Sequence, residues 1–236
     1  MKIKFLGQNC FLFTYNGKNI LSDPFYNFQK EQTGFDVSAQ KIDYVLITHA
    51  HSDHIADVRE VLQHHPDAMV IGQPEICGYF NHPNSIDINF GGSAKFDDLK
   101  ISMVPAHHTS SFPDGTYGGQ PCGYMFRFQG KNLYFAGDTG VMADMELFPR
   151  LFGEITAAIL PIGSHYTMCA RKASFAAAEL LKTKRVIGCH FDTFEPIKIN
   201  HDSAKQLFAE RNIEFSIPEL GEEFEVQFSE KFQKKT

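Results

Sequence analysis

The segment "LITHAHSDHIAD", residues 46–57, constrains this chain most, because three histidines and an aspartate fall within six positions directly after an apolar run. His49 and His51 are two residues apart at the end of an expected strand, so extended backbone would point their side chains the same way. Asp53 and His54 follow in an expected turn, which can fold them back toward the same point. Neutral imidazoles and a carboxylate suit zinc, and also Mn or Fe. A histidine-rich polar loop is the alternative, but four such residues so close together favour a metal site.

Further metal-capable residues follow other expected strands. The pair His107 and His108 comes after "ISMVPA", Asp138 ends "NLYFAGD", and His190 ends "RVIGCH". Binding sites in α/β folds gather where strands end at their carboxyl termini. The sequence therefore predicts that residues from these strand ends complete one site with the histidine-rich segment.

The order of expected elements indicates one α/β domain over residues 1–236, with sheets buried between helices. "CFLFTYNGKNILSDPF" predicts a hairpin at Asn16-Gly17. "IDYVLITH" is typical of a buried strand, and the apolar spacing of "IADVREVLQHH" predicts a helix. We expect residues 24–41 to be irregular and residues 107–123 to form a long loop of the kind that is usually functional. The last third, ending in "EFEVQF", alternates strands and helices.

Charge and composition narrow the expected partners. The formal net charge is −6 and no long Lys/Arg run occurs, which argues against nucleic acid or an anionic membrane as the main partner. No apolar stretch is long enough for a membrane helix, and we expect no signal peptide. Five scattered cysteines suggest reduced thiols and a cytoplasmic location. We expect a small-molecule substrate, and homo-oligomerisation stays open.

Several motifs together resemble a known family. "HAHSDH" matches the His-x-His-x-Asp-His signature of the metallo-β-lactamase superfamily. "PAHHTSS", "GDTG", "LPIGSHYTM" and "CHFDTF" resemble a small bacterial group of metal-dependent hydrolases, which is similar to ascorbate-6-phosphate lactonases and, more distantly, to N-acyl-phosphatidylethanolamine phospholipase D. The opening "FLGQNCFLFTYNGKNILSDPF" is similar to this group's first hairpin, so the resemblance covers nearly the whole chain. It implies a four-layer αββα sandwich of the metallo-β-lactamase type, with a dinuclear metal centre along one edge.

The resemblance also assigns ligands to two divalent ions, zinc first and Mn or Fe as alternatives. It gives three histidines to one ion, an aspartate and two histidines to the other, and one aspartate to both: His49, His51 and His108; Asp53, His54 and His190; Asp138. We expect one oxygen of Asp138 on each ion. His108 is preferred to His107 because the family pattern is Pro-Ala-x-His. Gln8 departs from the family, which often has His there, and this leaves substrate specificity open.

Two such ions would lie about 3.5–4 Å apart and share one water molecule. Binding to the ions would lower the pKa of that water from about 15.7 toward about 7. The resulting bridging hydroxide predicts a hydrolase acting on a small ester or lactone, with Asp53 orienting the water. A phosphodiesterase acting on a small phosphoester and a non-catalytic, metal-dependent metabolite sensor are the alternatives. His165 is a candidate proton donor to the leaving group, although a surface histidine explains it equally well.

Residues outside the ligand set have weaker assignments. The carboxylates and hydroxyl that we expect to orient the histidines from behind are Asp23, Ser22 and Asp192. Arg171 and Lys172 suit either an anion-binding role or a solvated helix start.

Overall fold

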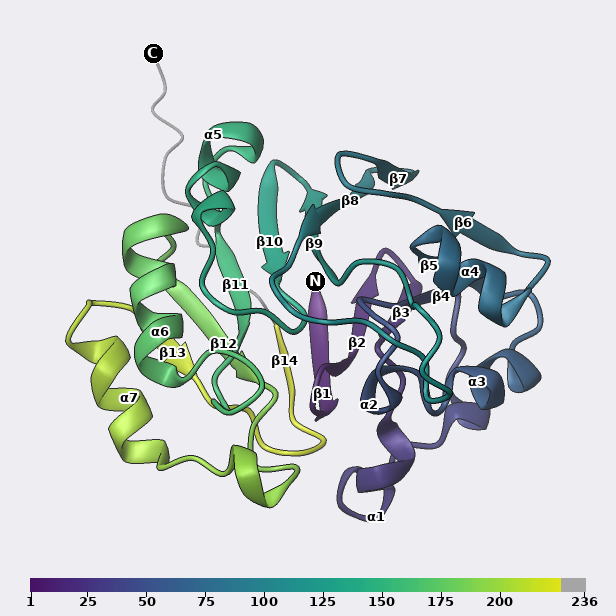
Figure 1. Cartoon of the computed structure of the whole chain (residues 1–236), viewed down its shortest axis with the longest axis horizontal. Coiled ribbons are helices and arrows are strands. Elements are labelled where there is room, and N and C mark those ends of the chain that lie inside the picture. Colours follow the sequence, from purple (N-terminus) through teal and green to yellow (C-terminus); the bar gives the residue numbers. More distant parts are fainter. Residues whose placement is uncertain (226–236) are drawn as a thin grey trace.

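Two seven-stranded sheets pack face to face, and helices cover their outer faces (Figure 1). This computed structural model describes residues 1–225. The αββα sandwich that the resemblance implied is confirmed. None of the helices within residues 1–225 has the length and apolar character that a membrane crossing requires.

The first sheet has the order β14-β1-β2-β3-β4-β5-β6. Its strands, in chain order, are β1 (Lys2–Gly7), β2 (Cys10–Tyr15), β3 (Lys18–Ser22), β4 (Tyr44–Leu46), β5 (Met69–Gly72), β6 (Ser85–Asp87) and β14 (Glu223–Glu225). β1, β2 and β3 pair antiparallel, whereas β3 to β6 pair parallel. The expected hairpin is confirmed at Asn16 and Gly17, whose φ angles of 48° and 72° suit a tight turn between β2 and β3.

The second sheet has the order β13-β12-β11-β10-β9-β8-β7. Its strands are β7 (Ser93–Phe96), β8 (Leu99–Pro105), β9 (Cys122–Phe128), β10 (Lys131–Phe135), β11 (Ala157–Pro161), β12 (Arg185–Cys189) and β13 (Glu214–Ser216). β7 to β10 pair antiparallel and β10 to β13 pair parallel. Each sheet therefore has a parallel half whose carboxyl ends lie along one edge.

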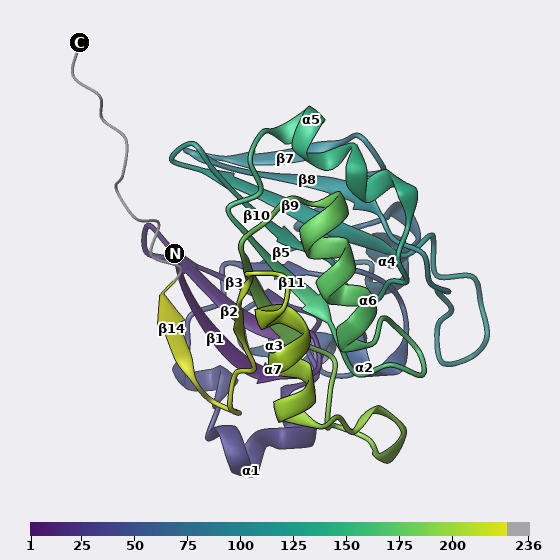
Figure 2. The same cartoon turned by 90° about the vertical axis from the view of Figure 1, so that its left-hand side faces the viewer.

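Short helices connect the strands. The α-helices are α1 (Lys30–Thr33), α2 (Ser52–Ile55), α3 (Val58–His64), α4 (Pro74–Phe80), α5 (Phe148–Phe152), α6 (Ala170–Phe175), which continues as a π-helical turn (Ala176–Leu180), and α7 (His201–Ala209). Single 3₁₀ turns lie at Tyr26–Gln29, Val37–Ala39, Ala143–Glu146 and Glu195–Ile197. The two views show α1 to α4 beside the first sheet and α5 to α7 beside the second (Figures 1 and 2).

Three local expectations needed correction. The turn expected at Asp53 and His54 is a short helix, α2, and the helix expected from Ile55 begins three residues later, as α3. The Asp57 carboxylate between them accepts a hydrogen bond from the Asn27 backbone N–H at 2.8 Å. The segment 24–41, expected to be irregular, contains two 3₁₀ turns and α1. Of "EFEVQF", residues 223–225 form β14, which crosses to the first sheet and pairs antiparallel with β1, and the remainder lies outside the described residues.

Aromatic rings fill the space between the two sheets. The Phe13 side chain on β2 is fully buried, with its ring centroid 5.0 Å from that of Phe126 and 6.0 Å from that of Phe135. Phe11 approaches Phe135 from the same strand as Phe13, also at 6.0 Å. Since β2 belongs to the first sheet while β9 and β10 belong to the second, these rings hold the two sheets together.

Removing one of these rings tests this packing. We expect Phe13→Ala to lower the free energy of unfolding by about 3–5 kcal/mol, because it deletes buried apolar surface and leaves a cavity. Leu151→Ala in α5, where the side chain is 71% exposed, should stay within about 0.5 kcal/mol of wild type. Urea denaturation measures both values. Equal stability of the two variants would contradict this account of the core.

Candidate metal centre

The metal-capable side chains lie just beyond strands of both sheets. β4 leads to His49, β8 to His108, β10 to Asp138 and β12 to His190. Gly137, immediately before Asp138, has φ +60°, and a Cβ there would lie 2.7 Å from the Cys122 carbonyl oxygen. Only glycine fits that position, so the close approach of the loop after β10 depends on it.

Three histidines form the first group of facing donors. Ring nitrogens of His49, His51 and His108 all lie within 4.8 Å of one another. His49 Nε2 and His51 Nδ1 are 3.0 Å apart. Two nitrogens bound to one tetrahedral zinc would be separated by roughly 3.3 Å, given Zn–N distances near 2.05 Å. The spacing of these two rings therefore fits a shared cation.

The second group joins an aspartate to two histidines. The His54 Nε2 atom lies 3.6 Å from Asp53 Oδ2, and His190 Nε2 lies 3.7 Å from the same oxygen. His54 is fully buried, and its Nε2 has no hydrogen-bond partner. A buried ring nitrogen that faces carboxylates and has no hydrogen-bond partner is the kind of atom whose position a metal cation can fill.

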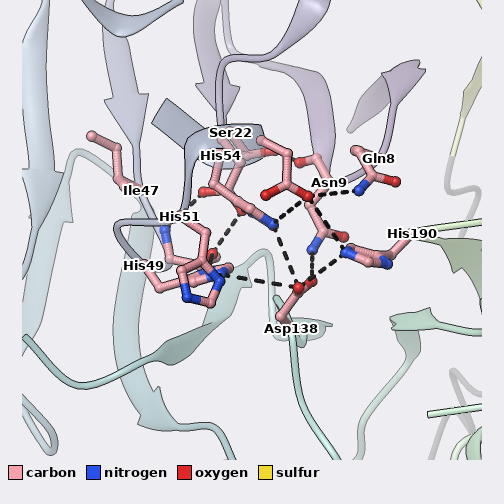
Figure 3. A network of polar contacts seen from close by, with 12 residues as sticks. Gln8, Asn9, Ser22, Ile47, His49, His51, His54, Asp138 and His190 are labelled. Carbon is pink, nitrogen blue, oxygen red and sulfur yellow. Dashed lines mark hydrogen bonds and ion pairs between the residues drawn. The ribbon is translucent and has the colours of Figure 1, made fainter. Parts of the chain in front are cut away.

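Asp138 lies between the two groups (Figure 3). Its Oδ2 is 3.0 Å from the Nε2 atom of His190, 3.5 Å from those of His54 and His108, and 4.0 Å from that of His49. We had expected one carboxylate oxygen to face each ion. Instead, Oδ1 accepts a hydrogen bond from the Asn9 side-chain amide at 2.7 Å, so Oδ2 alone faces both groups.

One buried carboxylate orients histidines of both groups from behind. Asp23 Oδ2 accepts from His54 Nδ1 at 2.8 Å and from the Thr48 hydroxyl at 2.7 Å. The Thr48 oxygen lies 3.0 Å from His49 Nδ1, which donates to it because the hydroxyl proton already points to Asp23. Both imidazoles are thereby held with a proton on Nδ1 and with Nε2 turned toward the site. Burial raises the pKa of Asp23, while these hydrogen bonds favour its ionised form.

Of the three side chains expected in this orienting role, only Asp23 contacts a site histidine. The Ser22 hydroxyl donates to the Asn9 carbonyl oxygen at 2.8 Å and accepts from the Phe11 backbone N–H, so it supports the loop rather than a ring. Asp192 pairs with His201 Nε2 at 2.6 Å. The expectations for Ser22 and Asp192 were wrong because sequence position alone does not tell which polar group lies behind a ring.

Two neighbouring amide side chains hold the site carboxylates, a role that the sequence had predicted for neither: Gln8, noted only as a departure from the family, and Asn9, which was missed. Gln8 and Asn9 form the turn between β1 and β2, where Gln8 has φ 52° and both side chains are fully buried. The Gln8 amide nitrogen donates to Asp53 Oδ2 at 2.8 Å, and Asn9 holds Asp138 as described above. Each of these two carboxylates thus has an amide donor from the β1–β2 turn. The sequence signal that could have indicated this role is the pair of adjacent polar residues, Gln8 and Asn9, between two apolar strands.

Burial and neighbouring charges shift the pKa values of His49 and His54 in opposite directions. Burial, with help from the His54 charge, holds the pKa of His49 well below its usual range. Burial also acts to lower the pKa of His54, but the carboxylates of Asp53, Asp138 and Asp23 outweigh it and raise that pKa well above the usual value. Three carboxylates therefore attract positive charge to the position of His54.

The two facing carboxylates are ionised. Burial acts to raise the pKa of Asp138, yet the neighbouring His190 and His54 hold it well below its usual range. Burial opposes ionisation of Asp53 as well, but His54 and the Gln8 hydrogen bond lower its pKa. Neutral His49 and anionic Asp53 and Asp138 are the donor forms that a divalent cation requires, so the residues present fit a metal.

The two histidines of "PAHHTSS" have different surroundings. His108 points into the first donor group, with its side chain 12% exposed. His107 is exposed and contributes backbone hydrogen bonds to Thr139 and Gly140. The loop that follows is tied to the histidine-rich segment by the Ser110 hydroxyl, which accepts from the Ala50 backbone N–H and donates to the Gly118 carbonyl oxygen.

A pocket of about 630 Å³ opens above the donor groups. Its lining residues are Phe25, His51, Ser52, Asp53, His108, Thr109, Asp138, Tyr166, His190, Phe194 and Pro196. His165 is not among them: it is exposed, and its ring packs edge-on against Tyr166 with centroids 4.4 Å apart. Arg171 and Lys172 are exposed on α6 and do not line the pocket either.

Comparisons with known proteins agree with this geometry. Residues 18–191 match the model of the β-lactamase superfamily domain. A UPF0173 metal-dependent hydrolase of Flavobacterium johnsoniae is 40% identical over 228 residues, covering 96% of this chain and all of that protein. The structure of a metallo hydrolase of Ignicoccus hospitalis is similar with a TM-score of 0.84 and 33% identity, covering 96% of this chain and 99% of that one. A metallo-β-lactamase fold protein of Bacillus subtilis, with a TM-score of 0.75 and 15% identity over 95% of this chain and 99% of that one, shares the fold. The chain therefore belongs to the UPF0173 family of metal-dependent hydrolases, within the metallo-β-lactamase superfamily.

Proposed function

We propose that this protein is a dinuclear metal-dependent hydrolase that cleaves a small ester or lactone. The observation that carries the proposal is the position of Asp138 Oδ2, within 4.0 Å of four imidazole nitrogens at the base of an open pocket. Relatives named as metal-dependent hydrolases support the reaction class. The motifs similar to lactonases favour an ester or lactone over a phosphoester.

The donor groups supply ligands for two ions, most favourably zinc. One ion takes three histidines, the other takes an aspartate with two histidines, and one aspartate serves both: His49, His51 and His108; Asp53, His54 and His190; Asp138. Because Asn9 donates to Oδ1 of Asp138, Oδ2 is the oxygen that would serve both ions. Imidazole nitrogen and carboxylate oxygen are the donors that zinc prefers in catalytic sites.

Such ions, when bound, lower the pKa of water and polarise the oxygen that gains negative charge. The protein's own residues then orient the reactants. Asp53 is the more accessible carboxylate, 25% exposed against 2% for Asp138, so it accepts a hydrogen bond from the attacking water. Gln8 holds Asp53 in place for that role. Tyr166, rather than the expected His165, lies where a side chain contacts the bound substrate.

A turnover screen tests the reaction class. Protein loaded with zinc or manganese should contain about two equivalents of metal and hydrolyse lactones or p-nitrophenyl esters, and EDTA should abolish this activity. Faster hydrolysis of bis-p-nitrophenyl phosphate than of any ester or lactone would instead identify a phosphodiesterase. Fully metallated protein that turns over none of these compounds would contradict the hydrolase proposal and favour a metabolite-binding role.

The role of Asp138 is tested by its replacement. Asp138→Ala should retain at most about one equivalent of metal and lose more than about 100-fold in activity, because it removes the contact common to both ions. His107→Ala is the matched control at a neighbouring, exposed position and should keep both metals. Elemental analysis of the two variants gives the metal content, and full metal content in Asp138→Ala would refute the shared contact.

The orienting role of Asp23 gives a separate prediction. Asp23→Asn keeps the side-chain shape but removes the charge that fixes the protons on His54 and Thr48, so metal affinity should fall about 10–100-fold. Asp192→Asn makes the same chemical change at an aspartate that pairs with His201 outside the donor groups, and it should leave affinity unchanged. Competition with a chromophoric chelator measures both affinities. An equal effect of the two substitutions would contradict the orienting role.

A further inference from the structure

Phe25 and Phe194 line the pocket, and Phe28 packs against both of them. We call these three rings the aromatic wall. The rings of Phe25 and Phe28 stack with centroids 5.1 Å apart and an interplanar angle of 15°. Phe194 meets Phe28 edge-on at 5.3 Å and lies 6.3 Å from Phe25. The wall thus joins the loop after β3 to the loop after β12, and mutual ring contacts hold its shape.

The wall exposes apolar surface beside the proposed metal site. Phe28, which stacks on the pocket residue Phe25, is 53% exposed. Tyr166, which lines the pocket, is 55% exposed. Pro196 adds a further apolar side chain to the lining. Exposed aromatic surface that borders a pocket marks a place where an apolar group of a ligand is removed from water.

The pocket offers no side-chain cation to an anionic group of a substrate. In the part of the chain that the structure describes, none of its lining residues is lysine or arginine. The Lys198 ammonium, two residues after Pro196, pairs with the Glu195 carboxylate at 2.5 Å. A phosphate or carboxylate on a substrate, away from the reacting bond, would therefore meet aromatic rings rather than a charge partner, and its desolvation would be uncompensated.

We propose that the substrate is an uncharged ester or lactone that carries an apolar chain or ring, and that this apolar group lies against the aromatic wall. The inference rests on the proposed hydrolase function and deepens it. The ester or lactone group lies over Asp53 and Asp138 at the base, and the apolar group extends toward Phe28 and Phe194 at the mouth. Phe28 and Phe194 are specificity-determining residues in this account.

The test uses the zinc-loaded protein and p-nitrophenyl esters of two to eight acyl carbons. The specificity constant kcat/KM should rise up to about fourfold for each added methylene until the chain covers the wall, which corresponds to the transfer free energy of a methylene group. A p-nitrophenyl hemisuccinate, with a terminal carboxylate, should be at least about tenfold poorer than the butyrate ester of equal acyl length.

Variants of the wall separate this effect from general activity. Phe28→Ala changes a half-exposed ring that belongs to no donor group. The variant should therefore fold, keep its metal content and lose most of the gain in kcat/KM with chain length. Phe194→Ala should act in the same direction. Phe175→Ala, at an exposed ring on α6 that contacts Arg211, is the control and should keep the full chain-length dependence.

Two contrary results are distinguishable. Hydrolysis of all esters at similar kcat/KM, or a chain-length gain that survives in both wall variants, would overturn the aromatic wall as the specificity element while the hydrolase function stands. A preference for the hemisuccinate over the butyrate would overturn it as well. Failure to hydrolyse any ester or lactone, with metal bound, would overturn the proposed function and this inference together.

Discussion

The site depends on one buried carboxylate oxygen. Asp138 Oδ2 faces histidines that come from both sheets, and the carboxylate is 2% exposed. An ionised carboxylate removed from water must be compensated by hydrogen bonds or positive charge. The Asn9 amide satisfies its other oxygen, and four imidazole nitrogens lie within 4.0 Å of Oδ2, among them the unpartnered Nε2 of His54. Divalent cations would satisfy the carboxylate and the imidazoles at once, which is why this arrangement favours a dinuclear centre.

Residues of the first sheet orient the side chains of this site through hydrogen bonds. The β1–β2 turn contributes the two amides that hold Asp53 and Asp138, and Asp23, just after β3, fixes the protons of His49 and His54. The second sheet contributes Asp138 itself. The phenylalanine packing between the sheets therefore sets the distance between Asp138 and the side chains of the first sheet that face it.

Local patterns predicted that the histidine-rich segment and residues at several strand ends form one site, whereas the αββα layers and the division of the donors into two groups came from the resemblance to the metallo-β-lactamase superfamily. The two-residue spacing of His49 and His51 fixes their relative direction in extended backbone, and strand ends in a parallel sheet converge at one edge. The pattern Pro-Ala-x-His selected His108 over His107, and the structure turns His108 inward. The same family resemblance, to the metallo-β-lactamase superfamily, supplied that pattern.

The remaining features depend on contacts between segments far apart in the chain. Gln8, Asn9 and Thr48 have no periodicity or motif that marks them as orienting groups, and the aromatic wall joins residues 25–28 to residue 194. His165 was favoured because it follows a strand, yet its turn directs Tyr166 to the pocket instead. The pairing of β14 with β1 likewise spans the whole described chain.

An anomalous difference map from crystals of the zinc-loaded protein, recorded at the zinc absorption edge, tests the central claim most directly. The account predicts two peaks about 3.5–4 Å apart on either side of Asp138 Oδ2, one near His51 and His108 and the other near Asp53 and His190. A single peak, or two peaks that do not share Asp138, would contradict it.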